Sequence, residues 1–149
     1  MDSETENLRV YMLELAALIE APKSVLPLVG EFARDGGSPD GKPYSDTYDY
    51  LEVDNSGYHY VINERTKETS RTTSKNVDDV MYEAFVTVVS KMTSIHRKTL
   101  KTKASDPTVE HSTYKLLLMN KLNRNWAKRL QQDINKRRKN LSKIEIPKT

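Results

Sequence analysis

The sequence YDYLEVDNSGYHYVINERTKETSRTT, residues 48–73, decides the fold of this chain. Apolar and aromatic residues alternate with polar ones on both sides of residues 54–57, and this period of two is typical of half-buried strands joined by a tight turn. Gly57 can take the left-handed conformation that closes a three-residue loop with a bulge. The stretch therefore predicts a β-hairpin, and the Thr-rich residues 68–73 predict a third antiparallel strand.

The register of this hairpin depends on its loop. With the bulged loop, Leu51, His59 and Val61 share one face of the sheet. With a loop of two or four residues, Leu51 instead shares the core face with Tyr60, and His59 is exposed. Both registers agree with the sequence, so the aromatic side chains that face water are not decided at this stage.

The segments outside residues 48–73 predict helices. Residues 23–30 are apolar but interrupted by Pro27, and they predict a short helical turn. Residues 4–20 carry one apolar stripe at helical spacing, formed by Leu8, Tyr11, Met12, Leu15, Leu18 and Ile19. The apolar positions of residues 77–95 keep helical spacing for about five turns. A further helix is expected over about residues 108–120, and a last one after Asn123, which has the side chain of an N-cap.

The resulting fold class is α+β: an N-terminal helix, a small antiparallel hairpin or three-stranded sheet at about residues 48–73, and about three C-terminal helices that pack on it. A chain of 149 residues is one ordinary domain in length, so residues 1–149 are expected to form a single domain. Residues 140–149 are expected to be a flexible tail. The order of elements contains no internal repeat.

Composition excludes several functional classes. The chain has no cysteine, which removes disulfide frameworks, thiolate metal sites and thiol nucleophiles. Its acidic N-terminus lacks the features of a signal peptide, and no apolar run reaches membrane-spanning length. We therefore expect a cytoplasmic protein that does not insert into a membrane.

Charge is distributed unevenly along the chain. Residues 1–54 contain 4 Lys/Arg and 12 Asp/Glu, whereas residues 55–149 contain 20 and 9. If the two poles are separated in space, they can steer a charged partner. The alternative is that oppositely charged elements pack beside one another and partly cancel.

No motif for catalysis or for a cofactor is present. His59, His96 and His111 have no second ligand at metal-binding spacing, and no serine lies in a nucleophile elbow. The Gly- and Pro-rich residues 32–46 contain no phosphate-binding loop. We expect no catalytic residue, no metal and no cofactor, so the protein is not predicted to be an enzyme.

Acids and tyrosines interleave on the first strand and its approach. Tyrosine is enriched at protein interfaces, and neighbouring acids favour a basic partner. The alternative is that the acids line a solvated strand edge and the tyrosines pack in the core. The candidate partner-binding residues are Tyr44, Asp46, Tyr48, Asp49, Tyr50, Glu52, Asp54, Tyr58 and Tyr60.

The last helix offers a second, basic surface. Its charge indicates a nucleic-acid footprint, although no nucleic-acid-binding signature accompanies it and solvated basic helices are common. A nucleic-acid-binding accessory protein is therefore the alternative function. The residues of this alternative surface are Arg124, Lys128, Arg129, Arg137 and Arg138.

Two segments carry a family resemblance. Residues 50–89 and 121–136 resemble the bacterial immunity protein sixty-three family of polymorphic toxin systems. The matching pattern is Asp54 with Ser56-Gly57-Tyr58-His59-Tyr60-Val61, then Glu64-Arg65, then Thr72-Thr73 with Asp78, Asp79 and Tyr82, and finally Lys121-Leu122-Asn123 with Trp126-Ala127.

The resemblance implies a small cytoplasmic protein that binds a cognate bacterial toxin domain and blocks it by occupancy. No catalytic motif of the family is carried over. A toxin with a basic active cleft would dock on the acidic N-terminal half of this chain, whereas an acidic toxin would select the basic helices.

Overall fold

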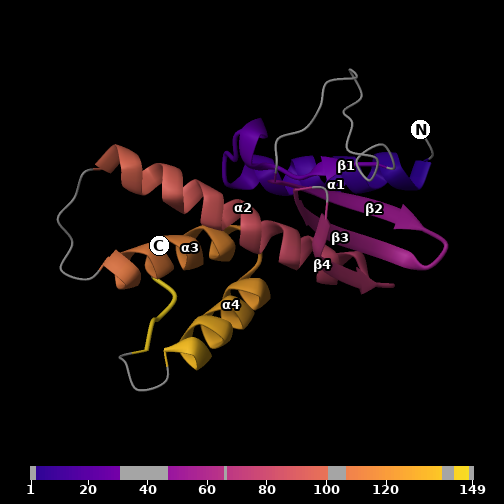
Figure 1. Ribbon diagram of the computed structural model, residues 1–149. Coiled ribbons are helices and arrows are strands. Elements are labelled where there is room, and N and C mark those ends of the chain that lie inside the picture. Colours follow the sequence, from indigo (N-terminus) through magenta and orange to yellow (C-terminus); the bar gives the residue numbers. More distant parts are fainter. Residues whose placement is uncertain (1–2, 31–46, 66, 101–106, 139–142, 148–149) are drawn as a thin grey trace. The chain divides into compact units, whose positions relative to one another are not determined.

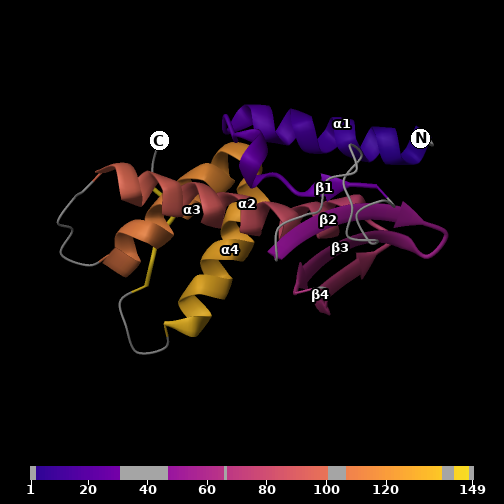
Figure 2. The ribbon, with the colours of Figure 1, turned by 45° about the horizontal axis from the view of Figure 1, so that its top comes forward.

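The computed structural model describes residues 3–30, 47–65, 67–100, 107–138 and 143–147, and within them the fold is α+β, as predicted (Figures 1 and 2). The chain divides into two compact units. Unit 1 comprises Met1–Ala16 and Leu26–Ala84, and unit 2 comprises Ala17–Val25 and Phe85–Thr149. The elements, in order, are α1 (Ser3–Leu18), a 3-10 turn (Lys23–Val25), β1 (Leu28–Val29), β2 (Thr47–Asp54), β3 (Gly57–Glu64), β4 (Lys67–Ser74), α2 (Val77–Leu100), α3 (Pro107–Leu122) and α4 (Arg124–Arg137).

The sheet of unit 1 has the strand order β1-β2-β3-β4. Its last three strands are antiparallel, as expected, but the prediction of three strands was wrong because β1 pairs in parallel with β2. Residues 23–30 form a helical turn only over Lys23–Val25. Pro27 has no N–H and disfavours helix at the residue before it, so Leu28–Val29 continues as a short edge strand.

The hairpin turn is tighter than the bulged loop that the sequence suggested. Asp54 pairs with Gly57, so the loop has two residues, and the register runs without a shift to Leu51 opposite Tyr60. The Asp54 carboxylate accepts hydrogen bonds from the Ser56 backbone N–H at 2.8 Å and from the Ser56 hydroxyl at 2.6 Å. An aspartate that bonds two residues ahead closes a turn by itself, which explains why no third loop residue is needed.

This register divides the sheet side chains between two faces. The Leu51 face holds Asp49, Leu51, Val53, Tyr58, Tyr60 and Ile62, and the Tyr50 face holds Tyr48, Tyr50, Glu52, His59, Val61 and Asn63. Leu51 and Tyr60 are buried on the first face, and Tyr50 and Val61 are buried on the second. His59 is only 5% exposed, so the expectation that a two-residue loop exposes it was wrong.

Helix α1 completes unit 1 by burying one stripe of its surface. Leu8, Met12 and Leu15 are buried, as their helical spacing predicts. Two hydrogen bonds fix the helix from its flanks: the Arg9 guanidinium donates to the Val29 carbonyl at 3.1 Å, and the Tyr11 hydroxyl donates to the Asp78 carboxylate at 2.7 Å. The α1 helix is therefore tied both to β1 and to the first turn of α2.

Unit 2 contains the packed pair α3 and α4. The Asn123 side chain accepts a hydrogen bond from the Trp126 backbone N–H, which confirms the predicted N-cap of α4. The predicted tail, residues 140–149, is described over residues 143–147. Within it Ile144 is buried, and its backbone exchanges hydrogen bonds of 2.7 and 3.0 Å with the Asn135 amide.

Candidate partner-binding surface

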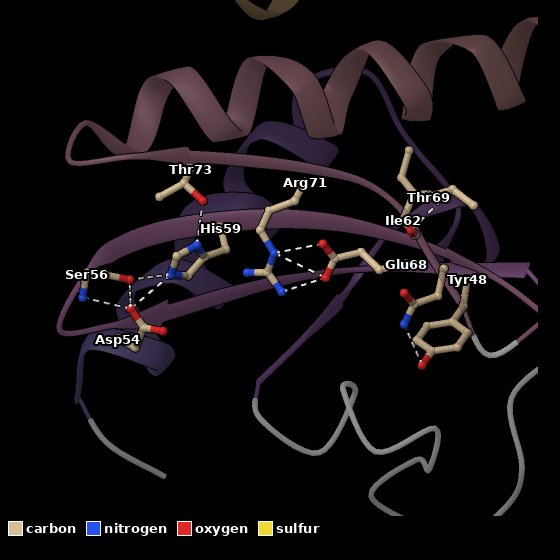
Figure 3. A network of polar contacts seen from close by, with 10 residues as sticks. Tyr48, Asp54, Ser56, His59, Ile62, Glu68, Thr69, Arg71 and Thr73 are labelled. Carbon is tan, nitrogen blue, oxygen red and sulfur yellow. Dashed lines mark hydrogen bonds and ion pairs between the residues drawn. The ribbon is translucent and has the colours of Figure 1, made fainter.

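A chain of polar contacts crosses the Tyr50 face near the hairpin turn (Figure 3). The Nε2 atom of His59 lies 2.9 Å from Asp54 Oδ1 and 3.1 Å from Ser56 Oγ. Its Nδ1 atom lies 2.8 Å from the Thr73 hydroxyl on β4. One buried imidazole thus joins the end of β2, the turn and the neighbouring strand, so the hairpin tip is held as a rigid piece.

Ser56, His59 and Asp54 are the residue types of a hydrolase triad, but their geometry differs from one. In a triad the acid holds one ring nitrogen of the histidine while the nucleophile faces the other. Here the acid and the hydroxyl lie on the same nitrogen, and Ser56 donates its proton to Asp54 at 2.6 Å. These hydrogen bonds, from Ser56 first and from His59 second, hold the pKa of Asp54 well below its usual range. The arrangement is a structural clamp.

Further along the Tyr50 face, Arg71 and Glu68 form a two-pronged ion pair. The Arg71 Nη2 atom donates to Glu68 at 2.7 Å, and the Nε atom donates at 3.1 Å. The pair lowers the pKa of Glu68 and raises that of Arg71, mainly through these hydrogen bonds. Both side chains are about two-fifths exposed, so the pair orders the surface more than it stabilises the fold.

The aromatic part of the Tyr50 face is ordered too. The rings of Tyr48 and Tyr50 stack with centroids 6.2 Å apart, and the Asn63 amide donates to the Tyr48 hydroxyl at 2.8 Å. Burial raises the pKa of the Tyr50 phenol. Tyr50 is buried, so Tyr48 is the ring of this pair that a partner can cover, and a ring held in one orientation loses little entropy when it is covered.

The nine candidate partner-binding residues do not share one face of the sheet. Tyr44 and Asp46 lie outside the described residues. Four candidates, Tyr48, Tyr50, Glu52 and Asp54, belong to the Tyr50 face, and Asp49, Tyr58 and Tyr60 belong to the Leu51 face. The Tyr60 hydroxyl donates to the buried Asp49 carboxylate at 2.6 Å.

Two of the three acids of β2 are buried and do not line a solvated strand edge. Asp49 is 5% exposed and Glu52 is 4% exposed, whereas Asp54 is open to solvent and Tyr48 is half-buried. The sequence reasoning also missed Glu68, Arg71 and Thr73, the β4 members of the polar network. Thr73 contacts His59 on another strand, and Glu68 and Arg71 share a face only because the register shifts opposite Ile62 and Asn63, so alternation within β4 does not place the three residues together.

The basic candidates are carried by unit 2. Arg124, Lys128, Arg129 and Arg137 of α4 are exposed, and Arg138 is half-buried. Burial lowers the pKa of Lys115 on α3, and the charge of Arg137 lowers it further. By sequence, unit 1 contains 7 Lys/Arg and 16 Asp/Glu, a net charge of −9, and unit 2 contains 17 and 5, a net charge of +12. The charge asymmetry of the sequence therefore coincides with the division into units.

Unit 2 also has a pocket of about 300 Å³. His96 and Tyr114 line it and stack on each other with centroids 4.0 Å apart and planes 3° apart. Leu117 and Pro147 contribute apolar surface to the lining of the pocket, and Arg97 contributes a charged group. Among the described residues, no group of three or more His, Asp or Glu side chains is placed to hold a metal ion.

The comparison with protein families gives a match over residues 54–136, more than half of the chain. The matching model is that of Immunity protein 63. The chain belongs to the Immunity protein 63 family. Neither the curated proteins nor the solved structures gave a match. Within the part of the chain that the structure describes, no helix has the length and apolar character needed to cross a membrane.

The range that matches Immunity protein 63 contains the whole clamp around His59. It begins at Asp54 and includes the turn, β3, β4 and the helices up to Lys136. Helix α1, β1 and most of β2 precede it. The clamped turn therefore belongs to the part of this Immunity protein 63 chain that the family model describes.

Proposed function

We propose that this protein is an immunity protein that binds a cognate bacterial toxin domain and neutralises it by covering its active surface. The observation that carries the proposal is the match to Immunity protein 63 over residues 54–136. The bonding of the polar side chains to one another around His59 supports inhibition by occupancy, because side chains committed to mutual hydrogen bonds suit a rigid binding surface.

The docking surface that we propose lies on the acidic unit 1 at the hairpin. Asp54 is exposed at the tip, and Tyr48 offers a half-buried ring that Asn63 and Tyr50 hold in place. The candidates Asp49, Glu52 and Tyr60 are buried, so they add no contact area of their own to this surface. A unit with a net charge of −9 favours a basic toxin surface and accelerates its encounter.

Co-expression tests this function directly. The chain is expressed in bacteria together with each toxin domain encoded beside its gene, and survival is scored. Rescue from one toxin, with a stoichiometric complex and loss of toxin activity after purification, is the expected result. If the chain rescues growth from none of these toxins, the proposed function is wrong.

A hairpin variant tests the location. Asp54→Asn should weaken toxin binding, whereas Glu64→Gln, an exposed acid at the other end of β3, is the matched control. Because Asp54 also closes the turn, the folded state of the variant is verified by its circular dichroism spectrum. Equal affinities of the two variants would place the toxin elsewhere on the chain.

The second candidate function is nucleic-acid binding by the basic helices. The specific observation in its favour is the net charge of +12 on unit 2, with exposed arginines and lysines on α4. Such binding should weaken steeply as salt rises, because phosphate contacts release counterions. A labelled duplex and a labelled single strand that fail to bind at low salt would exclude this function.

A further inference from the structure

The solvent-facing side of α1 carries apolar side chains that are not buried in the core. Among the described residues, four large hydrophobic side chains are exposed: Val10 at 43%, Leu13 at 48%, Leu18 at 57% and Ile95 at 47%. Three of the four lie on α1. Single exposed apolar residues are ordinary, but several on one helix mark an interaction surface.

Helix geometry places Val10 and Leu13 together. They are three residues apart, and they lie on the side of α1 opposite the buried stripe that contains Leu8 and Met12. Ala17 follows four residues after Leu13 and is also exposed. A surface helix needs one apolar stripe to pack on its core, and α1 has a second that faces solvent.

The orientation of this second stripe is fixed. Arg9 and Tyr11 project from the flanks of the helix, and their hydrogen bonds to Val29 and Asp78 prevent α1 from rolling about its axis. Rotation that buried Leu13 would break both bonds. The stripe therefore stays outward in the free protein, and a partner that binds it does not need to reorient the helix.

The charges beside the stripe indicate what kind of partner surface is complementary to it. Glu6 and Glu14 are exposed acids on the same outward side of α1, and the unit to which they belong has a net charge of −9. Glu6 already shares its charge with Arg9 at 2.8 Å, which leaves Glu14 as the acid directly beside Val10 and Leu13. Apolar area with an acidic border fits an apolar patch with a basic border.

We propose that the outward face of α1, formed by Val10, Leu13 and Glu14, is a docking surface for an apolar, lysine- or arginine-bordered surface of the toxin. The inference rests on the proposed function and names the chemistry of its partner. In both views the N-terminal end of α1 and the β2–β3 turn lie at the same end of unit 1 (Figures 1 and 2). Helix α1 and the hairpin thus belong to one acidic unit, and a single toxin can contact both.

Two variants separate the apolar and the charged contributions. Val10→Ser with Leu13→Ser removes the apolar area, and Glu14→Lys reverses the charge. The matched control is Ile95→Ser, which removes the fourth exposed hydrophobic side chain, on α2. All three proteins should remain folded and unfold close to the wild-type midpoint, because the changed apolar side chains are about half exposed and lie outside the core.

The probe is the purified toxin domain that the wild-type chain neutralises. The double serine variant should bind it with a Kd about tenfold or more above that of wild type, mostly through faster dissociation. Glu14→Lys should slow association several-fold at low salt, and the difference should vanish at high salt. Ile95→Ser should bind like wild type.

The outcomes distinguish the two proposals. If the wild-type chain neutralises no toxin, the proposed function fails and the docking surface fails with it. If the wild-type chain neutralises a toxin and the two α1 variants bind it with unchanged Kd and association rate, the α1 surface alone is refuted. A fall in affinity for Ile95→Ser equal to that of the double variant would also refute it.

Discussion

Replacing Gly57 with alanine tests the hairpin turn on which the whole sheet register depends. Gly57 has a φ angle of +129°, which side chains with a Cβ rarely adopt. A Cβ atom at this position would also meet the Ser74 carbonyl oxygen at 2.8 Å. That oxygen belongs to the backbone of β4, so the contact is relieved only if the strand moves.

The cost follows from these two terms. Holding a residue with a side chain in such a conformation costs about 1–3 kcal/mol, and overpacking against backbone adds about 1–3 kcal/mol. Alanine has less conformational freedom than glycine in the unfolded chain, and this offsets about 0.4–1 kcal/mol of the destabilisation. Gly57→Ala should therefore reduce the free energy of unfolding by about 3 kcal/mol, which corresponds to about 6–12 °C in Tm for a chain of this size.

Urea unfolding followed by far-UV circular dichroism measures this loss. Trp126, the single tryptophan, lies in unit 2, so its fluorescence shows whether the two units unfold together. The matched control is Asn55→Ala, a change at an exposed loop position without positive φ, which should cost less than about 0.5 kcal/mol. If Gly57→Ala is as stable as wild type, or if Asn55→Ala is equally destabilised, the account of the turn is wrong.

Three further predictions concern other contacts. Burial first, and then the hydrogen bond to Asp78, raise the pKa of Tyr11 to about 12. The wild type should therefore lose stability as pH rises from 10 to about 12, and Tyr11→Phe should lose less over this range, because the raised pKa of Tyr50 still contributes. Asn123→Ala removes the cap that accepts from Trp126 and should cost about 1 kcal/mol of unfolding free energy. The lowered pKa of Asp54 means that its carboxylate contributes stability at neutral pH that is lost in acid, so below pH 4 the wild type should lose stability more steeply than Asp54→Asn.

Each of these has its own control. Absorbance of the phenolate follows the Tyr11 titration, and a wild-type chain in which every tyrosine titrates near pH 10 would contradict the first prediction. Asn125→Ala, an exposed change two residues after the cap, should not lower the stability of α4, because alanine is the better helix former. For Asp54, parallel stability curves of wild type and variant between pH 2 and 4 would show that the clamp does not act through this carboxylate.

Local signals in the sequence predicted most of the elements. The alternation on both sides of residues 54–57 predicted β2 and β3, the Thr-rich residues 68–73 predicted β4, and the apolar spacing of residues 77–95 predicted α2. The cap at Asn123 was read correctly because a cap depends on a few adjacent residues. The family resemblance rested on short motifs of the same local kind, and the match over residues 54–136 confirmed it.

The candidate site was harder to predict because burial is not local. The sequence treated Asp49 and Glu52 as surface acids, whereas both are buried, on opposite faces of the sheet. A strand that is buried on both faces usually reads as a continuous apolar run, but acids occupy buried positions of β2, so its sequence alternates like that of a strand with one solvated face. Leu18 shows the converse error, since its spacing placed it in the buried stripe of α1 and the structure exposes it.

By itself, the sequence determined the α+β class, most of the element types, the family and the separation of acidic from basic halves, because these depend on composition and on residues within a few positions of one another. Only the tertiary structure decided that β1 joins the sheet, that the turn has two residues, that His59 clamps it, and that Leu13 faces outward. Each of these depends on which distant segment a residue meets. In particular, a shift of one residue in the strand register would move every side chain of the hairpin to the other face.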